Sequence, residues 1–143
     1  MADRQVIADF ARSMGIATSG LRAQAGRMRV ISENIANADS TATTAGGDPY
    51  RRKVPTFSSE LDRTLDAQVV SMGKIKPDAT AFRVKHEPGN PAADAAGNVK
   101  YPNVNPLIEM TDMRDAQRSY EANLNIISAT RRMVALTLNI LKS

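Results

Sequence analysis

Apolar residues recur at alternating steps of three and four near the N-terminus, which is the spacing of one face of a long helix. The row consists of Ile7, Phe10, Met14, Ala17, Leu21, Gln24, Met28, Ile31 and Ile35. Gln24 is its one strongly polar member. A row sustained over about four heptads predicts a coiled-coil seam along an N-terminal helix at residues 1–36.

The same spacing returns in the last third of the chain. The row there consists of Met113, Gln117, Tyr120, Leu124, Ile127, Arg131, Val134, Leu138 and Leu141. A second row of Ile126, Met133 and Ile140 widens the apolar face beyond what one partner helix would cover. We therefore predict a C-terminal helix at residues 107–143 with at least two neighbours, and Pro106 as its start signal.

The middle of the chain has a different pattern. All seven prolines lie between positions 49 and 106, and proline breaks helix interiors. Short strand-like stretches occur at residues 68–76, 80–86 and 98–101, and EPGNPAADAAGN between the last two is predicted to close a hairpin. Residues 57–67 are compatible with a helical start. We predict a small mixed or β region at residues 57–106.

Together these patterns predict a mainly α fold, in which two long terminal helices pack as a coiled-coil-like pair beside a small irregular or β middle region. The chain has three Phe, three Tyr and no Trp, so its core must use smaller apolar residues, which suit helix seams. Gly15, Gly20 and Gly26 weaken the first helix by roughly 1 kcal/mol each relative to alanine. We expect this helix to depend on a partner.

A soft segment at residues 37–56 joins the first helix to the middle region. Residues 38–49 contain no large apolar side chain, and Tyr50-Arg51-Arg52-Lys53 then restores bulk and charge. Asn34 and Asn37 are candidates to cap the helix end. A flexible linker is the simpler interpretation, but a linker needs no such ordered series of residues.

The amino-acid composition excludes several kinds of catalytic and metal-binding site. The absence of cysteine excludes disulfides, thiolate metal sites and cysteine nucleophiles. The single histidine, His86, excludes a multi-histidine metal site. His86 and Glu87 are the one candidate acid/base pair, but they lie among Pro, Gly and Lys, where a solvated histidine is the better interpretation. We predict no enzymatic activity, no cofactor and no metal.

The net charge of +4 is spread thinly, with clusters only at Arg51-Arg52-Lys53 and Arg131-Arg132. Nucleic-acid binders carry a basic stripe with aromatic or helical readers, so we expect no nucleic-acid partner.

No apolar run of signal-peptide length opens the sequence, and the stretch at 133–141 is too short to span a membrane. These rules alone predict a cytoplasmic protein, although an uncleaved export signal would escape them.

Pattern alone leaves two main interpretations open. The chain either assembles with other subunits or forms a self-contained helical-bundle interaction protein that is not part of a filament. The wide apolar face of the C-terminal helix, the glycine-weakened first helix and the small middle region favour assembly.

The residues of the joint resemble a known family. Asn34-Ile35-Ala36-Asn37-Ala38, followed by Thr44, Gly47 and Tyr50, is similar to the ANxxTxGY signature of bacterial flagellar rod and hook proteins, in a stretched form. The run YEANLNIISATRRMVALTLNILKS resembles the terminal helix shared by these axial proteins. The resemblance therefore covers both ends of the chain.

The resemblance implies a structural subunit of the flagellar proximal rod, the helically assembled shaft that transmits torque from motor to hook. It implies a place in the basal body, in the rod that spans the periplasm, and type III export without a cleaved signal peptide. The expected partners are the chain itself, other proximal and distal rod proteins, the adaptor joining rod to membrane ring, the rod-cap protein and the export apparatus. No direct membrane span is expected.

We predict that subunit contacts use both apolar rows and the joint. The predicted interface residues are Ile7, Phe10, Met14, Leu21, Met28, Ile31, Asn34, Ile35, Asn37, Thr44, Gly47, Tyr50, Arg51, Arg52, Lys53, Tyr120, Leu124, Ile127, Arg131, Val134, Leu138 and Leu141. Helical lattices require contacts that do not close on themselves. We further predict that Arg51, Arg52 and Lys53 meet acidic residues on adjacent subunits.

Overall fold

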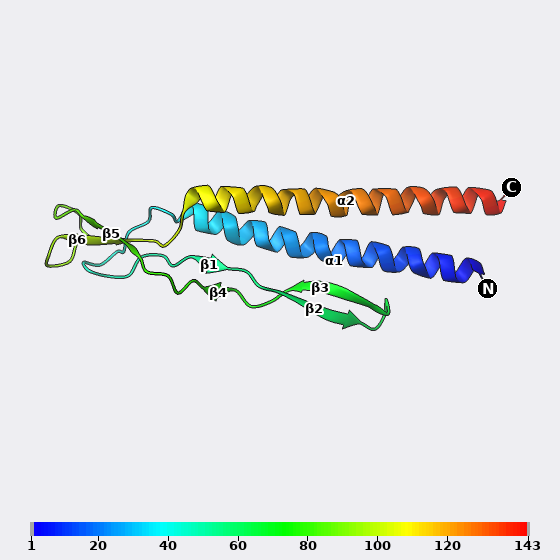
Figure 1. Cartoon of the computed structure of the whole chain (residues 1–143), viewed down its shortest axis with the longest axis horizontal. Helices are drawn as coiled ribbons and strands as arrows, with labels where there is room; N and C mark the ends of the chain where they lie inside the picture. The colour runs from blue at the N-terminus through cyan, green and yellow to red at the C-terminus, as the bar shows by residue number, and fades with distance from the viewer. Residues whose placement is uncertain (1, 143) are drawn as a thin grey trace. The chain divides into compact units, whose positions relative to one another are not determined.

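Two long helices and six short strands make up the described part of the chain (Figure 1). This part comprises the backbone of residues 2–142 and the side chains of residues 5–140 of a computed structural model. Helix α1 spans Ala2–Ala36 and helix α2 spans Pro106–Lys142, which begins at the predicted proline. The predicted mainly α fold with a small β middle region is confirmed.

The described strands pair as three separate antiparallel ladders. They are β1 (Lys53–Val54) with β4 (Lys76–Pro77), β2 (Phe57–Asp62) with β3 (Ala67–Met72), and β5 (Arg83–His86) with β6 (Asn98–Tyr101). The β5–β6 hairpin lies where the sequence predicted one. A helical start at residues 57–67 is wrong, because residues 57–62 form strand β2 and pair with the valine-containing β3. Phe57 and Leu61 lie four residues apart, and this spacing puts them on one face of a strand as well as on one face of a helix.

The chain divides into two compact units. The first contains α1 up to Arg27, the β2–β3 hairpin and α2 from Asp115. The second contains the end of α1, the joint, the other two ladders and the start of α2. Each unit therefore combines segments that are far apart in the sequence.

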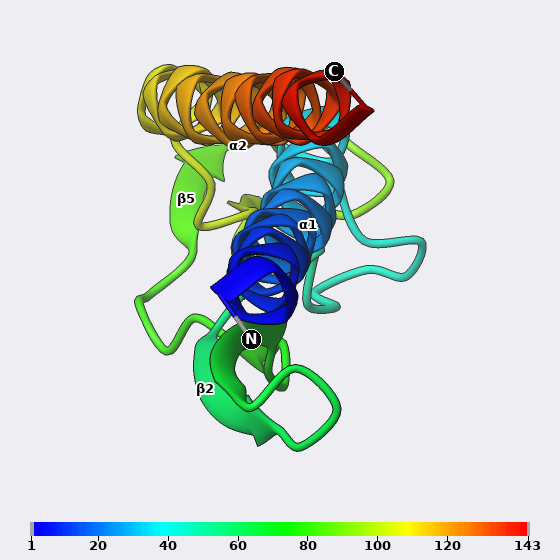
Figure 2. The same cartoon turned by 90° about the vertical axis from the view of Figure 1, so that its right-hand side faces the viewer.

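In the first unit, α1 lies between α2 and the β2–β3 hairpin (Figure 2). On the α2 side, a Cβ atom added to Gly20 would lie 2.9 Å from Asn123 Nδ2. This glycine is a place where a side chain of α2 reaches the backbone of α1.

The hairpin covers two further glycines of α1. The Leu65 side chain occupies the space that a Cβ atom on Gly15 would need, and Met72 Sδ would lie 2.6 Å from a Cβ atom on Gly26. Arg12 Nε also donates to the Leu65 carbonyl at 2.9 Å. Glycine at these positions allows the hairpin to pack directly on the helix backbone, a role that the helix-propensity argument did not predict.

The buried row of α2 is shifted by one residue from the predicted seam. Ala116 and Thr130 are 0% and 2% exposed, whereas Gln117, Leu124 and Arg131 are exposed. Four other members of the same predicted seam are half-buried, namely Met113, Tyr120, Ile127 and Val134. The search missed Ala116 and Thr130 because small or polar residues give no signal in a search for large apolar ones.

Replacing Gly26 by valine is expected to lower the free energy of unfolding by about 1–3 kcal/mol, because the Met72 side chain must leave the helix surface. Ala25→Val places the same side chain at the neighbouring exposed position and should cost only its helix propensity, about 0.5 kcal/mol. Chemical denaturation followed by circular dichroism measures both variants. Equal losses would show that the Met72 contact does not require glycine.

Candidate functional site

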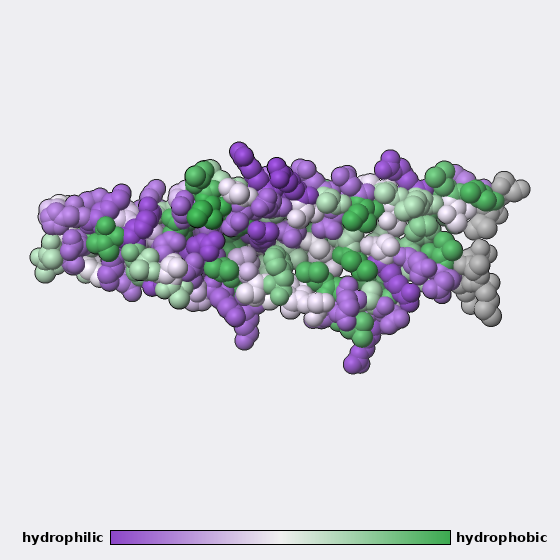
Figure 3. Space-filling model, in the orientation of Figure 1, coloured by the Kyte–Doolittle hydropathy of each residue, from purple (hydrophilic) through white to green (hydrophobic). Residues whose placement is uncertain are grey.

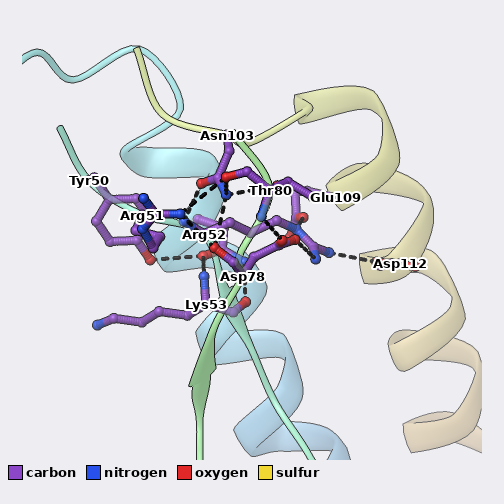
Figure 4. Close-up of polar contacts among 10 residues, drawn as sticks. Tyr50, Arg51, Arg52, Lys53, Asp78, Thr80, Asn103, Glu109 and Asp112 are labelled. Atoms are coloured by element: carbon purple, nitrogen blue, oxygen red, sulfur yellow. Dashed lines mark hydrogen bonds and ion pairs between the residues drawn. The ribbon is translucent and has the colours of Figure 1, made fainter. Parts of the chain in front are cut away.

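A buried carboxylate, Glu109, organises the second unit (Figure 4). Its side chain is 0% exposed and is the largest fully buried side chain in the described part of the chain. It accepts hydrogen bonds from Arg52 Nε on Oε1 at 2.5 Å and from Asn34 Nδ2 on Oε2 at 3.1 Å. Because an unpaired buried carboxylate is costly, these two donors permit Glu109 to occupy the core.

Helix α2 places this carboxylate in its first turn. Asn105 Oδ1 accepts the N–H of Leu107 at 3.1 Å, the bond of an N-cap residue. A negative charge in the first turn also interacts favourably with the helix dipole. The local sequence at the start of α2 thus fixes where Glu109 stands.

Arg52 links three acidic residues. Besides Glu109, it approaches Asp78 Oδ2 at 3.2 Å and Asp112 Oδ2 at 3.7 Å, and its side chain is 22% exposed. Its backbone N–H donates to Asn103 Oδ1 at 2.8 Å. Burial alone would lower the pKa of Arg52, but the hydrogen bond and charge of Glu109, followed by those of Asp78, raise that pKa above its ordinary value. The guanidinium is therefore a fixed, charged centre.

Asn34 joins α1 to the joint. Its Oδ1 accepts the N–H of Lys53 at 2.9 Å and the hydroxyl of Tyr50 at 2.8 Å, and its Nδ2 donates to the Lys53 carbonyl at 2.8 Å. The prediction that Asn34 caps the helix end is wrong, since it lies inside α1 and bonds to these distant residues. Asn37 acts at the helix end as predicted, because its Nδ2 donates to the Glu33 carbonyl at 2.9 Å.

Tyr50 and Lys53 complete the cluster on its more exposed side. Lys53 Nζ pairs with Glu33, and both side chains are 41% exposed. Burial, followed by the charges of Glu33 and Glu109, raises the pKa of Tyr50 to about 12. The phenol is therefore protonated at neutral pH and can donate its hydrogen bond to Asn34.

Arg51 has different surroundings from Arg52. Its Nη1 donates to the carbonyls of Asp78 and Thr80 at 2.9 and 3.1 Å, and its guanidinium lies 4.1 Å from the centre of the Phe82 ring. Arg52 already pairs with acidic residues of its own chain, and contact of the three cations with acids of adjacent subunits stays a prediction.

The predicted interface residues fall into three environments. Ile31 and Asn34 are buried; Phe10, Met14, Leu21, Met28, Ile35, Asn37, Gly47, Tyr50, Arg51, Arg52, Lys53, Tyr120, Ile127 and Val134 are half-buried; Ile7, Thr44, Leu124, Arg131 and Leu138 are exposed. The side chain of Leu141 lies outside the described residues. The structure brings Asn34, Tyr50, Arg52 and Lys53 together, while contact of these residues with another subunit stays a prediction.

Sequence reasoning missed the acceptors that hold Arg52. Glu109 follows Pro106 in a first helical turn, where an acidic residue is ordinary and gives no indication of burial. Asp78 and Asn103 each follow a proline in an irregular segment without periodicity.

A second candidate contact surface is the outer row of α2, formed by Ala122, Ile126, Ala129, Met133, Leu136 and Ile140. These residues follow steps of four and three and therefore share one helix face. The predicted members Ile126, Met133 and Ile140 are 48%, 47% and 73% exposed. Figure 3 shows hydrophobic side chains at the surface over the C-terminal half of α2.

The described residues show little else that suggests chemistry. No group of three His, Cys, Asp or Glu side chains among them is placed to hold a metal ion. His86 and Glu87 have separate partners, since His86 Nδ1 lies 3.3 Å from Asn98 Oδ1 and Glu87 accepts from the Tyr101 hydroxyl at 2.9 Å. Neither helix in residues 2–142 has the length and apolarity that a membrane crossing requires.

Two family models match the ends of the chain. The model described as "Flagella basal body rod protein" matches residues 14–42, and "Flagellar basal body rod FlgEFG protein C-terminal" matches residues 95–140. The first match contains Asn34 and the second contains Glu109. The two matched segments thus meet at the buried cluster.

Curated relatives match over nearly their whole length. The chain is 56% identical over 128 residues to the flagellar basal-body rod protein FlgC of Agrobacterium fabrum (strain C58), covering 90% of this chain and 92% of the relative. It is 38% identical over 143 residues to FlgC of Bacillus subtilis (strain 168), covering 90% and 95%. FlgC of Salmonella typhimurium (strain LT2) is 38% identical over 125 residues, covering 87% and 92%.

Replacing Arg52 by alanine is expected to lower the free energy of unfolding by about 3 kcal/mol, because Glu109 then stays buried without its counter-charge. The control is Lys53→Ala, which removes the adjacent cation. Because its partner Glu33 is partly exposed and can be solvated, this variant should lose less than about 1 kcal/mol of unfolding free energy. Urea denaturation followed by circular dichroism measures both losses. A loss for Arg52→Ala no larger than that of the control would contradict the central role of the buried pair.

Proposed function

The chain belongs to the FlgC family of flagellar basal-body rod proteins, and from this membership we propose that it is a structural subunit of the proximal rod. In this proposal it assembles helically, with further copies and with other rod proteins, into the drive shaft that transmits torque from motor to hook. Its work consists of contacts with neighbours rather than catalysis. The curated relatives are named as basal-body rod proteins, which supports the proposal.

The outer row of α2 is the observation that carries assembly. Ile126, Met133 and Leu136 are 48%, 47% and 62% exposed, although burial of such side chains is worth about 1.5–3 kcal/mol each. Contiguous exposed apolar surface of this kind marks an interaction site. Because the row has heptad spacing, the occupant with matching geometry is another helix. We assign that place to a terminal helix of an adjacent rod subunit.

The two rows of α2 allow an open assembly. Ala116 and Thr130 lie on the buried row, and the outer row lies roughly a quarter to a third of a turn further round the helix. One helix can therefore pack within its own chain and against a neighbour at the same time. Contacts between different surfaces of neighbouring subunits propagate into helical filaments.

The remaining partners follow from the proposed position in the rod. They are the other proximal and distal rod proteins, the adaptor that joins the rod to the membrane ring, and the rod-cap protein. The flagellar type III apparatus would export the chain without signal cleavage. The subunit would then lie in the part of the basal body that spans the periplasm.

Detergent-extracted basal bodies from the source cell provide the direct test of this function. Mass spectrometry and immunolabelled electron microscopy should find the chain in the proximal rod. Basal bodies that lack the chain, together with folded chain in the soluble fraction, would overturn the proposal. That result would favour a self-contained helical bundle.

Replacing Ile126 by aspartate should abolish rod formation and swimming, because the new charge would be buried against the adjacent helix. The free chain should still fold, since this position is 48% exposed before assembly. Asn125→Asp introduces the same residue one position away, outside the outer row, and should leave swimming normal. Soft-agar motility and electron microscopy of basal bodies measure the outcome. Normal rods with Ile126→Asp, or loss of swimming in both variants, would remove the row from the interface.

A further inference from the structure

An open groove of about 510 Å³ lies beside the buried cluster in the second unit. It is lined by Glu33, Tyr50, Arg51, Lys53, Ile75 and Pro77. Two of these side chains are cations and one is a carboxylate, while the others provide aromatic or aliphatic surface. The groove therefore combines apolar walls with an excess of positive charge.

The two cations of the groove differ in how their charge is balanced. Lys53 Nζ pairs with the Glu33 carboxylate. Arg51 is held by the carbonyls of Asp78 and Thr80, and no carboxylate among the described residues forms an ion pair with it. Carbonyl oxygens fix a guanidinium but carry no net charge. The charge of Arg51 therefore has no direct ion-pair partner among the described residues, although the Asp48 carboxylate, which is bonded to Lys100, lies near enough to interact with it.

The Arg51 guanidinium is also oriented in advance. One of its faces lies over the Phe82 ring, at 4.1 Å from the ring centre. Both hydrogen bonds to the carbonyls use Nη1, so the edge formed by Nε and Nη2 keeps its donors. This edge has the fork geometry that binds a carboxylate through two parallel hydrogen bonds. Fixing the side chain beforehand reduces the entropy lost when a ligand binds.

We propose that this groove binds a carboxylate from an acidic segment of an adjacent rod subunit, with Arg51 as its bidentate partner. The choice of a rod subunit rests on the proposed function. A polypeptide fits better than a free anion, because Ile75, Pro77 and the ring of Tyr50 can cover the carbon stem of a glutamate or aspartate.

The neighbouring cations cannot take this role equally well. Arg52 is already bonded to Glu109 and Asp78 inside the chain. Lys53 is a point charge that Glu33 largely compensates. Within the basic triplet, Arg52 therefore stabilises the fold, whereas Arg51 is the residue that binds the partner. A charged contact at a partly exposed site acts mainly on recognition and register.

Charge reversal at this position tests the inference in cells. Arg51→Glu should reduce the number of rods per cell by about tenfold or more, while Arg51→Lys, which keeps the charge but loses the fork, should have an intermediate effect. Lys85→Glu reverses a charge of the same unit outside the groove lining and should assemble normally. Thermal unfolding of each purified chain separates a folding defect from an assembly defect. Normal rods with Arg51→Glu would overturn the inference.

A crosslinking experiment keeps the test valid if Arg51→Glu does not fold. The chain has no cysteine, so Ile75→Cys places one unique thiol in the groove for a photoactivatable maleimide label. Irradiation of assembled basal bodies should join this position to a peptide of another rod subunit that contains Asp or Glu. Crosslinks only within the chain, to a peptide without carboxylates, to a lipid or glycan, or to nothing would each overturn the inference.

The location of the wild-type chain distinguishes a failure of the groove assignment from a failure of the proposed function. If it is present in purified rods but the Arg51 variants assemble normally, the groove assignment fails and the proposed function stands. If it is absent from basal bodies, the proposed function fails, and the groove loses the partner on which the inference rests.

Discussion

The second unit depends on one buried carboxylate and the two residues that bond to it. Glu109 meets Arg52 and Asn34, so a single charge ties the start of α2 to the joint and to the end of α1. A buried ion pair adds little net stability compared with apolar packing, but its bonds have direction. Apolar rows with heptad spacing can slide past each other by one repeat, whereas this cluster can form in only one register. The buried polar groups therefore specify the fold that the apolar rows leave ambiguous.

Helix α2 also reverses the usual arrangement of a monomeric protein. Its buried row has alanine and threonine at positions 116 and 130, while Leu136 and Ile126 of the outer row are exposed. In a monomer the larger apolar residues would occupy the buried face. Ala116 and Thr130 lie on the buried face, whereas the larger side chains of the outer row stay exposed. The distribution of residue size around α2 thus agrees with a helix that serves two contacts.

The helices and the β5–β6 hairpin could be predicted because their signals are local: apolar spacing, the placement of prolines and a loop rich in turn residues. The sequence did not allow us to predict which face of each helix packs inside the chain. A search for large apolar residues selected Leu124 and missed Ala116, because an alanine gives no signal in such a search even where it is fully buried. The role of Glu109 was equally invisible, since its partners Asn34 and Arg52 lie far away along the chain. Contacts that depend on tertiary structure have no periodicity to reveal them.

The two units have different sources of order. The second is fixed by directed polar bonds around Glu109, whereas the first is held by side chains that pack on the glycines of α1. The first unit also leaves Gln24 Oε1 buried without a hydrogen-bond partner among the described residues, a cost of about 1–3 kcal/mol. This same unit carries the outer row of α2. Burial of the exposed outer row against a neighbour would add apolar contacts to this unit, which would couple its stability to assembly.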